Sequence, residues 1–60
     1  MRDLIIAGQK IVILEKRDEN TYIIKKARGK KHGFLLLDKM RYVIGTECVD
    51  FHISEFKKVA

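Results

Sequence analysis

The chain of 60 residues contains no proline, no tryptophan and one cysteine, Cys48. Without proline it has no rigid recognition segment and no X-Pro bond that would slow folding. A single thiol cannot form an internal disulfide, and small secreted domains usually depend on several. We therefore expect a protein of the reducing cytoplasm.

Long apolar runs are missing as well. The N-terminal run covers only residues 4–7, whereas a signal peptide needs a longer apolar core and a transmembrane helix needs about 20 apolar residues. We expect a soluble protein with one domain, over residues 1–60. A domain this short buries only about 60% of its unfolded surface, which leaves little scaffold for a substrate pocket, so we expect no enzyme. Its size would suit a phage or small microbial protein.

Short apolar runs, rich in β-branched and aromatic residues, occupy residues 11–14, 22–24, 34–37 and 42–44. Each is bounded by Gly, Asp, Asn or charged residues, and no stretch shows an apolar stripe with helical period. Such runs are typical of strands joined by tight turns. We expect six strands, at about residues 3–7, 10–16, 21–27, 33–38, 41–45 and 48–53.

The last expected strand alternates cleanly between apolar and polar residues. Its buried face would carry Val49, Phe51 and Ile53, and its exposed face Cys48, Asp50 and His52. Ser54 follows with the hydroxyl of an N-cap residue. This N-cap predicts a single helical turn over residues 55–58. Phe56 in that turn would fold back over an open end of the barrel.

Two segments carry a resemblance to a known fold. They read Gly8-Gln9-Lys10-Ile11-Val12-Ile13-Leu14 near the start and Val49-Asp50-Phe51-His52-Ile53-Ser54-Glu55-Phe56 near the end. Together with the strand pattern, they make the chain similar to the SH3-like small barrels of KOW-type and Tudor-like domains. The resemblance implies an all-β, antiparallel barrel of five or six strands with a short C-terminal helical turn. An OB-fold is the neighbouring alternative. Neither fold implies a particular chemistry.

The positive charge is concentrated in residues 25–41, which read KKARGKKHGFLLLDKMR. This stretch holds seven of the thirteen Lys and Arg residues and one acid, Asp38, for a net charge of +6. Residues 1–24 are neutral and residues 42–60 come to −1, so the formal charge of +5 originates here. Charge placed so unevenly usually faces a partner. A solvated hairpin with a basic tip is the alternative.

The candidate binding residues lie in and beside this stretch. They are Lys25, Lys26, Arg28, Lys30, Lys31, His32, Phe34, Lys39 and Arg41. The cations would contact phosphates, and Gly29 and Gly33 would let the backbone approach a phosphate closely. Lys39 and Arg41 are included because a hairpin over residues 34–44 is expected to bring the two ends of the stretch together.

Three aromatic residues near the stretch are candidates for base stacking: Phe34, Tyr22 and Tyr42. Phe34 follows the basic residues directly, although the leucines after it suggest a core ring.

Cys48, Asp50 and His52 invite a catalytic or metal-binding interpretation, with His32 as the other candidate ligand. Strand geometry argues against both, because residues two apart lie about 6.6 Å from each other and residues four apart about 13 Å. A nucleophile and its base need about 3 Å, and zinc ligands lie about 2 Å from the ion. We therefore expect no catalytic residue, no metal and no cofactor.

The sequence thus predicts a small non-enzymatic binding module whose basic loop meets either nucleic acid, DNA or RNA, or an acidic protein surface. Weak nucleic-acid binding without sequence specificity is the first hypothesis. A protein–protein adaptor, monomeric or homodimeric, is the second. Runs 11–14 and 34–37 favour it, since they are apolar on both sides of a strand.

Overall fold

An antiparallel β-sheet makes up most of the computed structural model, which describes the backbone of residues 2–59 and the side chains of residues 3–58. Its strands are β1 (Arg2–Ile6), β2 (Gln9–Lys16), β3 (Thr21–Lys26), β4 (His32–Leu36), β5 (Arg41–Ile44), β6 (Glu47–Asp50) and β7 (Phe56–Val59). Two 3-10 turns, η1 (Leu37–Lys39) and η2 (Ile53–Glu55), join β4 to β5 and β6 to β7. No helix in this part of the chain has the length and apolar character needed to cross a membrane.

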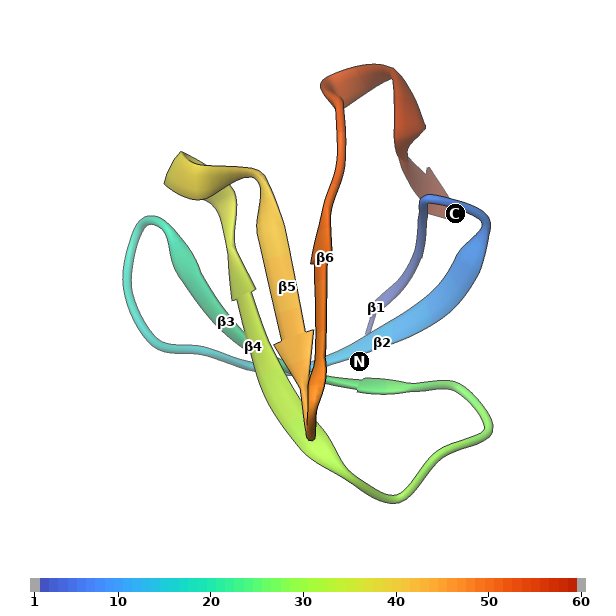
Figure 1. The fold of residues 1–60 in the computed structure, drawn as a ribbon. Coiled ribbons are helices and arrows are strands. Elements are labelled where there is room, and N and C mark those ends of the chain that lie inside the picture. The colour runs from blue at the N-terminus through green and yellow to red at the C-terminus, as the bar shows by residue number, and fades with distance from the viewer. Residues whose placement is uncertain (1, 60) are drawn as a thin grey trace.

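All neighbouring strands are antiparallel, in the order β6-β5-β4-β3-β2-β1-β7. Figure 1 shows this sheet curling into a half-barrel. The terminal strands of the order, β6 and β7, do not pair with each other. The all-β prediction is therefore confirmed and a small barrel-like shape is present. The strand number is seven rather than five or six among the described residues.

Local features of β1 and β2 explain part of the curl. The register between β2 and β3 shifts from Ile13↔Ile24 to Glu15↔Ile23, which leaves Leu14 as the extra residue of a bulge. A bulge bends its strand and increases the local twist. The β1–β2 hairpin closes through two residues with positive φ, Ala7 at 49° and Gly8 at 80°. Such tight turns match the right-handed twist of the strands they join.

The hydrophobic core lies on the concave side of the sheet. It consists of Leu4, Ile6, Ile11, Ile24, Leu35, Tyr42, Ile44 and Phe51. On β4 and β5 burial alternates, so Leu35 and Tyr42 face inward while Phe34 and Val43 do not. The period of two expected for a sheet with one covered face is therefore present in these strands.

The C-terminal segment differs from the expectation. The last predicted strand ends at Asp50, and Ile53, expected to be buried, is 74% exposed in η2. The turn is closed by the Glu55 amide, which donates to the His52 carbonyl at 2.8 Å, and the Glu55 carboxylate accepts from the His52 amide at 2.9 Å. The predicted C-terminal helical turn is therefore present only as the 3-10 turn Ile53–Glu55, with His52 rather than Ser54 as its N-cap, and the predicted bounds of 55–58 are wrong.

Residues 56–59 form β7 instead, which pairs with β1 from Ile6↔Phe56 to Asp3↔Val59. This pairing satisfies backbone groups of β1 that a helical turn would leave without a partner. Phe56 also stacks on Phe51, with ring centroids 6.0 Å apart. Backbone pairing and apolar packing therefore act together to hold this segment as a strand.

Candidate nucleic-acid interface

The loop of residues 27–31 connects β3 to β4 and contains the densest group of cations. It is anchored at its start, because the Ala27 amide donates to the Lys10 carbonyl at 3.0 Å and the Gly29 amide to the Lys26 carbonyl at 2.9 Å. Arg28, Lys30, Lys31 and His32 are exposed. An anchored backbone with exposed cationic side chains presents its charge to an anionic partner with little loss of backbone entropy.

Lys25 precedes this loop, and its ammonium group turns toward the loop backbone. Its Nζ donates to the carbonyl oxygens of Lys26, Ala27 and Gly29 at 3.3, 3.4 and 3.3 Å. Three carbonyl acceptors use the three donors of an ammonium group. Lys25 therefore shapes the loop, and its charge is partly taken up inside it.

Lys26 is engaged as well, but with a carboxylate. Its Nζ forms a salt bridge with Glu47 at the start of β6, and this hydrogen bond raises the pKa of Lys26. The pair joins strands that are not neighbours, because β3 and β6 are separated by β4 and β5 in the sheet order. Lys26 therefore links two strands that do not pair, and its charge is neutralised by its partner.

Arg41 and Lys39 lie away from the loop. Leu36 pairs with Arg41 and Gly33 with Ile44, so Arg41 is at the end of β4 opposite to residues 27–31. In Figure 1 the green loop lies at the lower right and the yellow turn of η1 at the upper left. The expectation that the hairpin would bring both ends of the basic stretch together is therefore wrong. In an antiparallel hairpin, the turn and the free ends of the strands lie at opposite ends, and each strand residue adds about 3.3 Å to the distance between them.

Arg41 is also paired. Its Nε donates to the Asp50 carboxylate on β6 at 2.6 Å, and this bond holds the pKa of Asp50 below its ordinary value. Lys39 is exposed in η1, where the Leu37 amide bonds to the Asn20 carbonyl at 2.8 Å. This hydrogen bond connects η1 to the β2–β3 turn, which contains Asp18 and Glu19.

Phe34 is the aromatic residue that the fold exposes next to the basic loop. Its side chain is 46% exposed on the convex side of β4, so the core ring suggested by the leucine run is wrong. The neighbouring Gly33 and Leu35 are buried, which fixes Phe34 on the outer side. Tyr42 is buried in the core and Tyr22 lines the concave side. Of the three stacking candidates, Phe34 alone is exposed on the outer side of the sheet.

Two residues that the sequence reasoning did not single out flank Phe34. Ile23 on β3 and Val43 on β5 are its register partners, and both are partly exposed. Side chains directly opposite one another in a sheet lie about 4.5–5.5 Å apart, so the three form one apolar strip on the convex side. Each of the three residues lies next to a buried residue of its own strand. This alternation is the sequence signal that could have identified Ile23 and Val43.

An open hollow of about 420 Å³ separates the loop from the β5–β6 turn. Lys30 and Lys31 line it from the loop, and Thr46 and Glu47 line it from the turn. The Glu47 carboxylate there is already paired with Lys26. The remaining charge of the hollow is therefore positive, which suits an anionic group such as a phosphate.

The two glycines of the loop region have different roles. Gly33 is buried in β4, and a Cβ there would lie 2.0 Å from the Val43 carbonyl oxygen. It therefore permits close approach of β5, and the prediction that it admits a phosphate is wrong. Gly29 lies in the loop, where a Cβ would meet only ordinary contacts at 3.4 Å or more.

Cys48 and Asp50 share the outer side of β6, as expected, but His52 lies beyond the end of that strand. Asp50 is paired with Arg41. Among the described residues there is no group of three His, Cys, Asp or Glu side chains that could hold a metal ion.

We expect the Arg41–Asp50 pair to make the free energy of unfolding depend on pH in the acidic range. Hydrogen bonds from Arg41 and from the Asn20 amide hold the pKa values of Asp50 and Asp18 below the ordinary 3.8. Such groups stabilise the fold fully above their unfolded pKa, and this stability is lost as pH falls through their folded pKa.

We therefore expect the urea midpoint to fall on acidification below about pH 4, and to fall less for Asp50→Asn than for wild type. The exposed Asp38→Asn should keep the wild-type acid dependence. An equal acid dependence in Asp50→Asn and wild type would contradict this role of the pair. Urea titrations at neutral pH and at about pH 3 measure it.

Four cations of the loop region, Arg28, Lys30, Lys31 and His32, and the nearby Phe34 are all exposed, and we call these five residues the basic-aromatic surface. In the structure, three further cations have partners within the chain, and Lys39 lies away from the loop. The three are Lys25, Lys26 and Arg41. No protein-family model, no curated protein and no solved structure matches the chain.

Proposed function

We propose that the chain is a small non-enzymatic module that binds single-stranded nucleic acid through the basic-aromatic surface. The observation that carries this proposal is the exposed Phe34, which directly follows an anchored loop of exposed cations. Basic side chains contact phosphates and release counterions, which gives affinity without sequence information. An exposed aromatic ring adds stacking, which accepts any base.

Single strands suit this surface better than duplexes. Phe34 lies on the convex side of a sheet with Ile23 and Val43 beside it, so its ring is accessible to a base that is not already stacked. Bases of a duplex have both faces covered by their neighbours, whereas a single strand can splay a base onto a protein ring. Lys30 and Lys31, which line the hollow, would contact phosphates of the same strand.

An SH3-like barrel remains our proposal for the finer fold. Two features support it. The last strand, β7, is entered through the short turn η2, and it returns to pair with the first strand, β1. Residues 8–14 and 49–56, which carry the resemblance in the sequence, lie in β2 and in the β6–η2–β7 segment.

Replacing Lys30 and Lys31 together with alanine should weaken single-strand binding and flatten its salt dependence. If each lysine contacts one phosphate, the slope of log K against log salt should fall by about 1.4. Both side chains are exposed, so thermal unfolding should change little. Fluorescence anisotropy with a labelled mixed-sequence oligonucleotide at several salt concentrations measures affinity and slope together.

The matched control is the pair Lys39→Ala with Lys57→Ala, which removes the same charge from exposed positions outside the surface. It should retain most of the slope. An equal loss in both double variants would show that net charge alone drives binding, and an unchanged affinity in Lys30→Ala/Lys31→Ala would remove the loop from the proposal.

Self-association is the second candidate function. The apolar runs 11–14 and 34–37 are not fully buried within one chain. Only Ile11 and Leu35 among their residues are buried. The strip of Ile23, Phe34 and Val43 could meet a second copy on the convex side. Sedimentation equilibrium that shows a monomer at high concentration would remove this candidate.

A further inference from the structure

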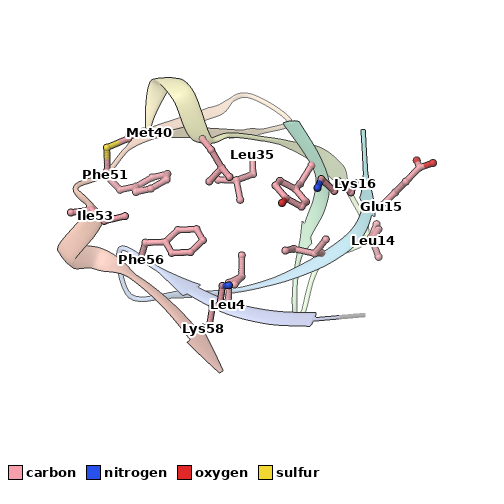
Figure 2. Close-up of a pocket in the computed structure, with 13 residues that line it drawn as sticks. Leu4, Leu14, Glu15, Lys16, Leu35, Met40, Phe51, Ile53, Phe56 and Lys58 are labelled. Carbon is pink, nitrogen blue, oxygen red and sulfur yellow. The ribbon is translucent and has the colours of Figure 1, made fainter. Parts of the chain in front are cut away.

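The concave side of the half-barrel holds a groove whose lining includes no residue of the basic-aromatic surface. It has a volume of about 710 Å³ and lies between the ends of β2 and β3, the η1 turn and the β6–β7 connection. Figure 2 shows residues from all these segments around one open space. Binding sites for small molecules usually enclose about 300–1,000 Å³ and are found in the mouths of β-barrels.

The walls of the groove are mainly apolar. They include Leu4, Ile13, Leu35, Met40, Phe51 and Phe56. Several of these belong to the buried core, whereas Met40 and Phe56 are only partly covered. The groove is therefore an uncovered extension of the core, and an apolar ligand that filled it would remove that surface from water.

The charged residues at the groove are mostly positive. Lys16 and Lys58 line it, and neither has a salt-bridge partner among the described side chains. Glu15 is the one acid among the lining residues, and Figure 2 shows its carboxylate directed away from the space. That carboxylate lies 4.0 Å from the Arg17 Nε instead. Apolar walls with two lysines match a ligand that has an apolar body and an anionic head.

A second copy of the chain fits less well. Placed mouth to mouth, it would bring Lys16 and Lys58 of both chains together, and like charges in contact oppose association.

We propose that the concave groove binds a small anionic amphiphile, such as a carboxylate or sulfonate on an aliphatic or aromatic body. Lys16 and Lys58 lie on opposite sides of the groove (Figure 2), so either one can pair with the anionic head at the rim while the apolar walls hold the body. The proposal does not depend on nucleic-acid binding, because no residue of the basic-aromatic surface lines the groove.

The test uses dodecanoate, below its micelle concentration, as the probe in an NMR titration of the labelled protein. We expect saturable shifts at groove residues such as Ile13, Leu37 and Phe56, and little change at residues 28–34. Dodecyltrimethylammonium, which has the same tail and the opposite charge, should bind more weakly. Lys16→Gln with Lys58→Gln should weaken dodecanoate binding about fivefold, which is the upper range expected for the loss of one exposed ion pair.

Lys39→Gln with Lys57→Gln is the matched control, because it removes the same charge from exposed positions that do not line the groove. It should leave dodecanoate affinity within about twofold of wild type. Equal weakening in both double variants, equal binding of the cationic amphiphile, or the absence of saturable shifts in the groove would each overturn the proposal. None of these results bears on oligonucleotide binding, which is measured separately.

Discussion

Replacing Gly33 with alanine is expected to leave the chain largely unfolded. A Cβ at this position would lie 2.0 Å from the Val43 carbonyl oxygen and 2.8 Å from the Ile44 Cα. Both are backbone atoms of β5, so no side-chain rotation can relieve the overlap. Forcing β4 and β5 apart should cost about 3 kcal/mol or more. A core of this size rarely supplies more than about 3–5 kcal/mol in total.

Gly29→Ala is the matched control for this substitution. A Cβ there would be 3.4 Å from the Lys26 Cβ and 3.7 Å from the Lys26 carbonyl oxygen, which are ordinary contacts. We expect its unfolding free energy to change by less than about 1 kcal/mol, because the restricted unfolded chain offsets any small strain. Circular dichroism and urea titration compare the two. A cooperative Gly33→Ala protein with wild-type stability would contradict the close approach of β4 and β5.

Replacing Phe34 with alanine should weaken binding of single-stranded nucleic acid about tenfold while leaving the fold intact. Stacking of one base on an aromatic ring contributes about 1–3 kcal/mol, and tenfold corresponds to about 1.4 kcal/mol. The ring is 46% exposed on the convex side and belongs to no buried cluster. Its removal should therefore lower the unfolding free energy much less than truncation of a core ring would, which costs about 3–5 kcal/mol.

Two further variants distinguish stacking from general surface effects. Phe34→Trp keeps an aromatic face and should retain most of the affinity. Ile53→Ala removes an apolar side chain that is 74% exposed in η2, and it should leave binding unchanged. Loss of binding in Phe34→Trp equal to that in Phe34→Ala, with both proteins folded, would exclude a stacking role. Binding to a duplex should be weaker than to a single strand and nearly insensitive to Phe34→Ala.

Strand positions could be predicted from the sequence because the apolar runs are short and bounded by turn residues. The six expected strands all occur, with ends that differ by at most three residues. The segment after η2 could not be predicted in this way. Phe56–Val59 is a strand because it pairs with β1, some fifty residues earlier in the chain, and a local pattern carries no information about that pairing.

The candidate site could be predicted only as a region. Its charge is visible in the sequence, but the partners of Lys25, Lys26 and Arg41 depend on how the chain folds around them. Glu47 is 21 residues from Lys26 and reaches it only because the sheet curls. The side on which Phe34 lies follows from the burial of Leu35, and the run FLLL alone does not reveal which of its residues face inward.

An NMR titration of the labelled protein with a mixed-sequence single strand tests the basic-aromatic surface most directly. At low salt the account predicts shifts at residues 28–34 and at the flanking Ile23 and Val43, which fade toward physiological salt. Residues 37–41, at the other end of β4, should not respond. Absence of shifts at low salt, or shifts centred on residues 37–41, would contradict the proposed interface.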